Sequence, residues 1–174
     1  QIETLGYYHS FLGRTCEITD QLAARLTGML PAPLDHVFFG TAGSEAVDTA
    51  LKLMGYYWNA RGKPEKKRVI ARTNAYHGSG ILSAAMTGFA FCHDGFDVPL
   101  PLVIRVERPH FWADHLPGES ETAFAKRRAA ELEAAILKAG PESIGAMIAE
   151  PAMGSGGVIL PPQGYWEEVQ AVLR

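Results

Sequence analysis

The feature that most constrains how this chain can fold is a repeated order of short apolar run, turn and amphipathic helix. Four apolar runs bounded by turn residues indicate buried strands, at residues 37–39, 69–71, 102–106 and 146–149. Apolar residues at three- and four-residue intervals indicate helices, at residues 20–30, 44–60, 79–86, 120–139 and from 161 onward. Continuous apolar strands that alternate with helices predict an α/β fold, with a mostly parallel sheet covered by helices on both faces.

Composition and charge exclude several classes of protein. Hydrophobic residues make up 47% and charged residues 20% of the chain, which is typical of a globular protein and not of a disordered one. The 16 Lys and Arg against 19 Asp and Glu include no basic block, so nucleic acid is not expected as a partner. No apolar run reaches the roughly 20 residues of a membrane span, and no signal-peptide pattern is present. We therefore expect a cytoplasmic protein with no membrane partner.

Cysteines and histidines do not indicate a disulfide or metal site. Cys16 and Cys92 are too few for a disulfide framework, and we interpret both as reduced. The histidines lack acidic or cysteine partners at metal-ligand spacing, so no bound metal is predicted.

The two ends of the sequence indicate a partial domain. Gln1 is not an initiator Met, and the last helical pattern reaches Arg174 without a terminating signal. A helix that follows a strand in such a pattern normally leads to another strand. We expect residues 1–174 to be part of a larger domain, truncated at both ends.

Three loops stand out because each follows a predicted strand, at residues 41–44, 74–78 and 150–157. In open parallel sheets, ligands bind just beyond the carboxyl ends of the strands. The three loops are therefore expected to converge on one site. The segment 107–118, rich in proline and aromatic residues, is a second candidate for a functional loop.

The first and second loops contain groups suited to a flat, phosphorylated ligand. Gly43 and Ser44 begin a predicted helix, where free backbone N–H groups and the helix dipole favour a phosphate. The alternative is that Ser44 is an ordinary N-cap. The Tyr76 ring could stack on a flat cofactor. The alternative there is a tyrosine packed on the sheet, beside a solvated His77.

The third loop places a carboxylate at the end of a buried strand. Glu150 is followed by Pro151 and a glycine-rich turn. A carboxylate at this position either serves a ligand or accepts hydrogen bonds from the backbone N–H groups of the turn. The sequence leaves both alternatives open.

Taken together and in this order, the three loops resemble class III aminotransferases. The segments that carry the resemblance are FFGTAGSEAVDTA at 38–50, YHGS at 76–79, EP at 150–151 and GSGGV at 154–158. The resemblance covers essentially the whole chain and is closest to the branch that acts on ω-amino acids or on an amine and pyruvate. It implies pyridoxal phosphate as the cofactor. It also implies that residues 1–174 form part of the large domain of a fold-type-I enzyme.

The resemblance assigns roles to several residues of the loops. Gly43 and Ser44 are expected to hold the cofactor phosphate, and Tyr76 to stack on the pyridine ring. Glu150 corresponds to a glutamate near the cofactor, expected to contact the aspartate that binds the ring. His77 belongs to the same cofactor loop, either orienting it or serving only the structure.

Three further positions are compared with the family. Phe11 and Ser155 match residues that line the substrate pocket, with simple packing as the alternative for each. Family members usually have serine where this chain has Ala42, so one hydroxyl near the phosphate is missing.

The two residues that carry the family's chemistry are not expected within this chain. They are an aspartate that bonds the pyridine nitrogen and a lysine that forms the Schiff base and moves the proton, and the resemblance places both beyond Arg174. The lysines that are present lie in predicted helices or polar turns, at positions 52, 63, 66, 67, 126 and 138. This segment alone is therefore predicted to be inactive.

The intact enzyme is expected to move an amino group from an amine or ω-amino acid to a keto acid such as pyruvate. The cycle would be ping-pong, through the pyridoxamine form of the cofactor, in a homodimer with active sites at the interface. The alternatives are another class III reaction, such as that of an aminomutase, racemase or decarboxylase, or a non-catalytic cofactor-binding or dimerisation module.

Overall fold

A computed structural model of the protein describes residues 1–9, 11, 13–98 and 101–174. The chain divides into two compact units, Gln1–Gly40 and Thr41–Arg174. The first unit contains two helices among its described residues, α1 (Ile2–Leu5) and α2 (Glu17–Thr27). The predicted helix at 20–30 is therefore present but begins and ends three residues earlier.

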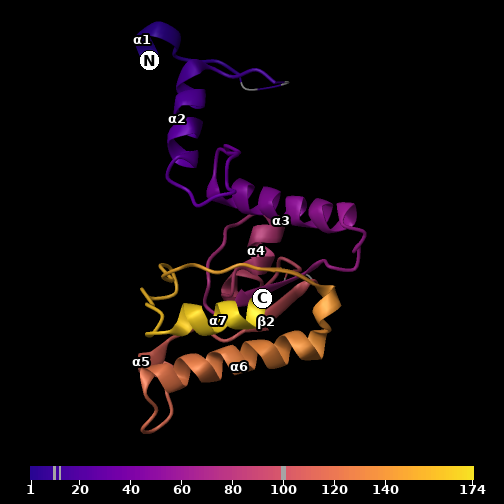
Figure 1. Ribbon diagram of the computed structural model, residues 1–174, viewed down its shortest axis with the longest axis vertical. Helices are drawn as coiled ribbons and strands as arrows, with labels where there is room; N and C mark the ends of the chain where they lie inside the picture. Colours follow the sequence, from indigo (N-terminus) through magenta and orange to yellow (C-terminus); the bar gives the residue numbers. More distant parts are fainter. Residues whose placement is uncertain (10, 12, 99–100) are drawn as a thin grey trace. The chain divides into compact units, whose positions relative to one another are not determined.

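The second unit is built on a parallel sheet of three strands, β1 (Arg68–Arg72), β2 (Val103–Val106) and β3 (Ile144–Met147). The strand order is β2-β1-β3, so β1 is central. The α-helices of this unit are α3 (Gly43–Ala60), α4 (Ile81–Met86), α5 (Phe111–Asp114), α6 (Glu121–Ala139) and α7 (Tyr165–Leu173) (Figure 1). Two short 3₁₀ helices, η1 (Ala90–Cys92) and η2 (Pro141–Ser143), lie between them.

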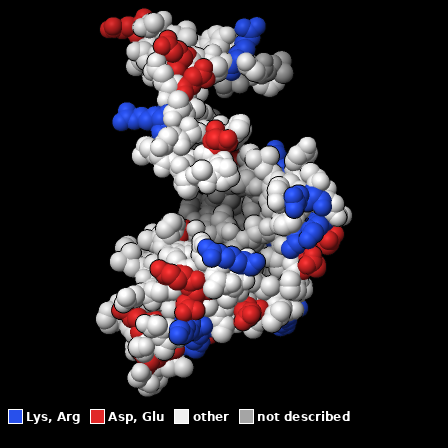
Figure 2. Space-filling model, in the orientation of Figure 1, with Lys and Arg blue, Asp and Glu red and all other residues white. Residues whose placement is uncertain are grey.

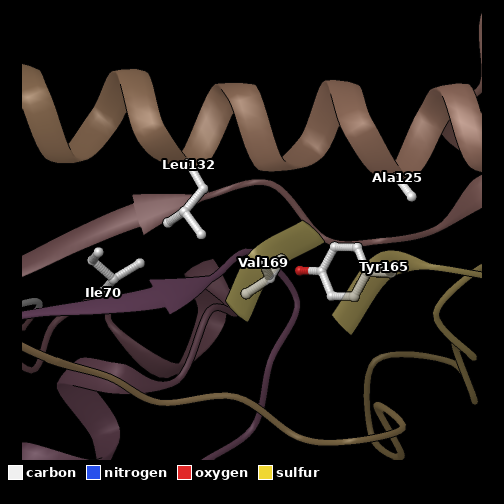
Figure 3. Close-up of a cluster of buried hydrophobic side chains, with 5 residues drawn as sticks. All are labelled: Ile70, Ala125, Leu132, Tyr165 and Val169. Carbon is white, nitrogen blue, oxygen red and sulfur yellow. The ribbon is translucent and has the colours of Figure 1, made fainter. Parts of the chain in front are cut away.

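Strand β1 separates two packed layers because its side chains alternate between the two faces of the sheet. Val69 and Ala71 pack on the face covered by α3 and α4. Ile70 packs on the opposite face with Leu132 of α6 and Val169 of α7 (Figure 3). The predicted α/β fold, with a parallel sheet and helices on both faces, is confirmed.

Local sequence signals explain where α6, the longest helix, begins and ends. The Ser120 hydroxyl accepts a hydrogen bond from the Ala123 N–H at 3.2 Å, and α6 stops at Gly140, whose φ of 86° favours glycine. Near the C-terminal end of α3, Trp58 Nε1 donates to the Gly145 carbonyl at 2.8 Å. That bond ties α3 to strand β3.

The prediction of a buried strand at residues 37–39 is wrong. This segment has no strand hydrogen bonds, and the Phe38 and Phe39 side chains are exposed. It belongs to the Gln1–Gly40 unit, where the described residues contain no other strand to pair with. An apolar run becomes a strand only when a neighbour satisfies its backbone groups. The loop at 41–44 thus does not follow a strand.

A network of ion pairs holds the segment after β2 against α6. The Arg127 guanidinium donates to Glu119 at 2.8 Å and to Glu131 at 3.0 Å. Arg128 pairs with Glu131 at 2.7 Å and with Asp114, the last residue of α5, at 3.5 Å. The predicted loop at 107–118 therefore includes a short helix and is anchored by charge.

This network predicts a loss of stability in acid. Hydrogen bonds from Arg127 lower the pKa of Glu119 from 4.5 to about 2. Because the folded pKa lies below the unfolded one, the stabilisation is present above about pH 4.5 and is lost as the pH falls toward 2. Glu119→Gln should lower the midpoint of thermal unfolding at pH 7. The difference in midpoint between the variant and wild type should become smaller between pH 4.5 and 3.

Thermal unfolding followed by circular dichroism at several pH values tests this expectation. Glu133→Gln is a matched control, since Glu133 is exposed on α6, the helix that carries Arg127, and pairs with no cation in the described residues. If the difference in thermal midpoint between Glu119→Gln and wild type stayed constant with pH, the lowered pKa of Glu119 would be contradicted.

Acidic and basic side chains are interspersed on the face of the Thr41–Arg174 unit drawn in Figure 2. They do not gather there into a patch of one sign. Among the described residues, none of the helices combines the length and the apolar character needed to cross a bilayer.

Candidate functional site

The first loop leads directly into the N-terminus of α3. The N-cap is Ala42, with extended backbone and no side-chain hydrogen bond to the helix. Gly43 and Ser44 are therefore the first two helical residues, and their N–H groups have no acceptor within the helix. Interpreting Ser44 as the N-cap is wrong. The Glu45 carboxylate turns back to Thr41, accepting from its N–H at 2.8 Å and from its hydroxyl at 2.7 Å. These bonds lower the pKa of Glu45.

The second loop is hydrogen-bonded to the first turn of α3. The Ser44 Oγ accepts from the Ser79 N–H at 3.0 Å. Gly78 makes this approach possible, because a Cβ there would lie 2.6 Å from the Ser44 Oγ. One helical turn further along α3, the Asp48 carboxylate accepts from the Ser83 N–H at 2.7 Å. The first turns of α3 are thus held at two points, by Ser79 directly after the second loop and by Ser83 of α4.

Glu150 joins the second loop to the third. Its Oε1 accepts from the Tyr76 N–H at 3.1 Å, and its Oε2 accepts from the Gly154 N–H at 3.0 Å. The third loop also passes close to the second at Gly156, where a Cβ would lie 2.5 Å from the Asn74 carbonyl oxygen. The structure therefore brings the three loops together, and the Glu150 carboxylate satisfies backbone N–H groups of two of them.

Tyr76 and His77 face opposite environments. Tyr76 is 44% exposed and therefore accessible to a ligand, whereas His77 is 8% exposed. The backbone N–H of His77 donates to the Thr87 hydroxyl at 3.0 Å. Burial lowers the pKa of His77, which leaves the imidazole neutral at pH 7. The alternative of a packed tyrosine beside a solvated histidine is wrong, because the two environments are exchanged.

Ser155 and Phe11 are less closely connected to this site. Ser155 is exposed on the third loop, next to Gly154, which bonds Glu150. Phe11 is 70% exposed and belongs to the Gln1–Gly40 unit, whose position relative to the loops is not determined. Their roles in a substrate pocket stay predictions.

Three residues that hold the loops in place, Asp48, Thr87 and Arg105, were not predicted from the sequence. Asp48 lies four residues after Ser44, so the two share one helix face, a spacing that could have revealed it. Thr87 and Arg105 have no comparable signal, since their contacts come from segments distant in sequence. In the described part of the chain, no three His, Cys, Asp or Glu side chains are placed to share a metal ion.

The lysines nearest the sheet lie away from the loops. Lys66 Nζ donates to the carbonyls of Pro141 and Ile144, and Lys67 Nζ donates to the Gly55 carbonyl. Both lysines precede β1 and are therefore at the amino end of the sheet. The second and third loops follow the carboxyl ends of their strands, so neither lysine lies near them.

Comparison with known proteins defines the class. A family model described as aminotransferase class-III matches residues 4–174, and the chain belongs to this family. Vanillin aminotransferase of Capsicum chinense is 51% identical over all of this chain, which spans 38% of that relative. Gamma aminobutyrate transaminase 1 of Solanum lycopersicum is 50% identical, and the chain spans 34% of it.

Solved structures agree with the sequence relatives. The omega transaminase from Pseudomonas jessenii, in complex with PMP, is 48% identical and superposes with a TM-score of 0.96. That alignment covers 99% of this chain and 38% of the other. A transaminase solved with L-ala is 46% identical, with a TM-score of 0.95 over 99% of this chain and 41% of the other. The prediction of the aminotransferase fold is confirmed, and the chain spans well under half of these relatives.

The uncapped start of α3 predicts that Ala42→Ser is stabilising. A serine at the N-cap accepts a hydrogen bond from an otherwise free N–H and adds about 1 kcal/mol relative to alanine. The free energy of unfolding in urea should rise by that amount. Ala50→Ser, at an exposed position within α3, is the control and should not stabilise. Equal effects of the two substitutions would contradict the expectation.

Proposed function

We propose that the protein containing this chain transfers an amino group from an amine or ω-amino acid to a keto acid such as pyruvate, with pyridoxal phosphate as cofactor. The observation that carries this proposal is the tethering of the three loops by the Ser44–Ser79 and Glu150–Tyr76 hydrogen bonds. The family membership and the relatives' names support it. L-Alanine, present in one related structure, is the amine that corresponds to pyruvate.

The residues of the loops fit a phosphorylated ring. The N–H groups of Gly43 and Ser44 would donate to the phosphate at the positive end of the α3 dipole. The Ser44 oxygen accepts from the Ser79 N–H, so the Ser44 hydroxyl proton is free to donate as well. Gly78 leaves room beside that hydroxyl. These groups would hold the phosphate through backbone and hydroxyl donors.

The ring itself would lie against Tyr76. The exposed tyrosine offers a stacking surface, and the Glu150 hydrogen bond to the Tyr76 N–H fixes the backbone that carries it. Both Glu150 oxygens bond backbone groups, so Glu150 orients the loops. The His77 side chain is buried behind the same loop, and the hydrogen bond from the His77 backbone N–H to the Thr87 hydroxyl would orient the loop. When bound, pyridoxal phosphate supplies an electron sink for the bond-breaking step at the substrate amine carbon.

The rest of the reaction would depend on parts of the protein outside this chain. We propose that a lysine and a ring-binding aspartate beyond Arg174 supply the nucleophile and the partner of the pyridine nitrogen. Phe11 and Ser155 are proposed to line the substrate pocket. A homodimer is also proposed, which light scattering of the purified protein would test.

A half-reaction distinguishes transamination from the alternatives. The full-length protein with pyridoxal phosphate should show a visible absorbance band that borohydride abolishes. Given an amine and no keto acid, it should release about one carbonyl product per active site and then stop until pyruvate is added. Loss of carbon dioxide, or inversion of the amine without carbonyl product, would instead indicate a decarboxylase or a racemase. Absence of the band would indicate a non-catalytic module.

Tyr76→Ala is expected to weaken cofactor binding. Loss of an aromatic stacking partner costs about 0.5 to 1.5 kcal/mol beyond the lost contact area, so the dissociation constant of pyridoxal phosphate should rise about tenfold. Tyr76→Phe keeps the ring and should bind nearly as wild type. The measurement is a fluorescence titration of the apoprotein with the cofactor. Equal dissociation constants for wild type and Tyr76→Ala would mean that the pyridine ring of the cofactor does not stack on Tyr76.

A further inference from the structure

Arg105, on strand β2, has a half-buried guanidinium that binds only carbonyl oxygens in the described structure. Its Nη1 donates to the Met86 carbonyl at 2.6 Å. Its Nη2 donates to the Ala85 carbonyl at 2.8 Å and to the Thr87 carbonyl at 3.1 Å. A longer contact of 3.4 Å reaches the Arg72 carbonyl at the end of β1. No carboxylate lies within ion-pair distance of it among residues 1–9, 11, 13–98 and 101–174.

These contacts cap the C-terminus of α4. The last carbonyls of a helix have no partner within the helix and carry the negative end of its dipole, so a cation there is favourable. Helix α4 has only 6 residues, too few to be stable by itself. Burial lowers the pKa of Arg105, but a guanidinium keeps its charge in proteins. The side chain therefore acts as a fixed cationic clamp on three successive carbonyls.

Thr87 connects Arg105 to the second loop, residues 74–78. It follows α4 directly, is fully buried, and its carbonyl is one of those that Arg105 holds. Its hydroxyl accepts from the His77 N–H at 3.0 Å and lies 3.2 Å from the Gly78 carbonyl. The next residue, Ser79, donates to the Ser44 hydroxyl at the proposed phosphate site.

We propose that Arg105 is a positioning residue for the cofactor: by clamping the end of α4 and Thr87, it sets the orientation of the Tyr76–His77–Gly78 backbone against the start of α3. This inference rests on the proposed function. Loss of the clamp changes how tightly and in what orientation pyridoxal phosphate is held, beyond any general loss of stability.

Arg68 offers a matched control. It lies on the neighbouring strand β1, is half-buried, and contacts the carbonyl of Ala139, the last residue of α6, at 3.5 Å. It therefore also places a guanidinium at the C-terminus of a helix, but at the amino end of the sheet. Both arginines are expected to stabilise the fold by binding carbonyls at a helix end. Only Arg105 is connected to the second loop, through Thr87.

The experiment compares full-length Arg105→Met, Arg105→Lys and Arg68→Met with wild type. The readouts are the thermal midpoint of the apoprotein, the dissociation constant of pyridoxal phosphate, and the visible circular dichroism per bound cofactor. We expect Arg105→Met to raise the dissociation constant at least tenfold and to reduce the dichroism. Arg105→Lys, which keeps the charge and three donors, should be intermediate. Arg68→Met should lower the midpoint and leave both cofactor readouts unchanged.

Thr87→Val keeps the inference testable if Arg105→Met does not fold, because it removes only the hydroxyl, which accepts from the His77 backbone N–H and lies within hydrogen-bond distance of the Gly78 and Ser83 carbonyls. It should also raise the dissociation constant and reduce the dichroism. Wild-type values in both Arg105→Lys and Thr87→Val, or equal cofactor losses in Arg68→Met, would overturn the positioning role while leaving the proposed function intact. A wild-type protein that binds no pyridoxal phosphate would overturn both.

Discussion

Replacing Gly88 by alanine is expected to destabilise the protein by about 3 to 5 kcal/mol, from overpacking together with the loss of two backbone hydrogen bonds. A Cβ at this position would collide with the Arg72 carbonyl oxygen and would lie 2.7 Å from the Asn74 nitrogen. Both are backbone atoms at the end of the central strand, so neither can rotate away.

Moving the chain to relieve this collision would break existing contacts. The Gly88 carbonyl accepts from the Asn74 N–H at 3.1 Å, and the Gly88 N–H donates to the Ala75 carbonyl at 2.7 Å. These two bonds hold Gly88 against the start of the second loop, residues 74–78. Gly88→Ala should therefore also weaken cofactor binding in any protein that remains folded.

Denaturant unfolding of the full-length protein measures the effect of Gly88→Ala. Gly154→Ala is the matched control, since a Cβ at Gly154 meets nothing within 4 Å, and its effect should stay within about 0.5 kcal/mol. Similar free energies of unfolding for the two variants would show that the backbone around Gly88 can shift to accommodate a Cβ, which would contradict the predicted destabilisation.

Glu150→Ala is expected to cost about 2 to 4 kcal/mol of stability and to separate the second and third loops. The substitution removes the acceptors of both the Tyr76 and the Gly154 N–H groups. A hydrogen bond to a charged group contributes about 1.5 to 3 kcal/mol, and solvent access to the Tyr76 and Gly154 donors places the total at the lower end of the sum of two such bonds.

Glu150→Gln separates the contribution of the two hydrogen bonds. The amide retains one oxygen that can accept, while its nitrogen can only donate, so about half of the stabilisation should remain. The measurements are the free energy of unfolding and hydrogen exchange at the Tyr76 and Gly154 amides. In Glu150→Ala both amides should exchange faster, and in Glu150→Gln one of them. Exchange at the wild-type rate in Glu150→Ala would mean that the carboxylate does not join the loops.

Long periodic segments and their end signals could be predicted because their causes are local. The apolar spacing of α3 and α6, and Ser120 and Gly140 at the ends of α6, act within one or two helical turns. Strand β1 was also evident, since its apolar run is buried on both faces. The apolar run at 37–39 had a similar pattern and is not a strand, because pairing depends on a neighbour and not on composition.

The candidate site was predictable only in part. The placement of the three loops after predicted strands indicated convergence, and the structure joins them through Glu150 and Ser44 although the first loop follows no strand. The sequence left open the alternative of a packed Tyr76 beside a solvated His77, which is wrong, because adjacent loop residues carry no periodicity that separates inside from outside.

The sequence by itself determined the alternation of strands and helices, the ends of the long helices and the family to which the chain belongs. Those features depend on residues close together in the chain or on whole segments in a fixed order. Only the tertiary structure decided which donors meet which acceptors: Arg105 on the Thr87 carbonyl, and Glu150 on the Tyr76 and Gly154 N–H groups. Such hydrogen bonds require distances near 3 Å between groups far apart in sequence, which are set by how the layers pack.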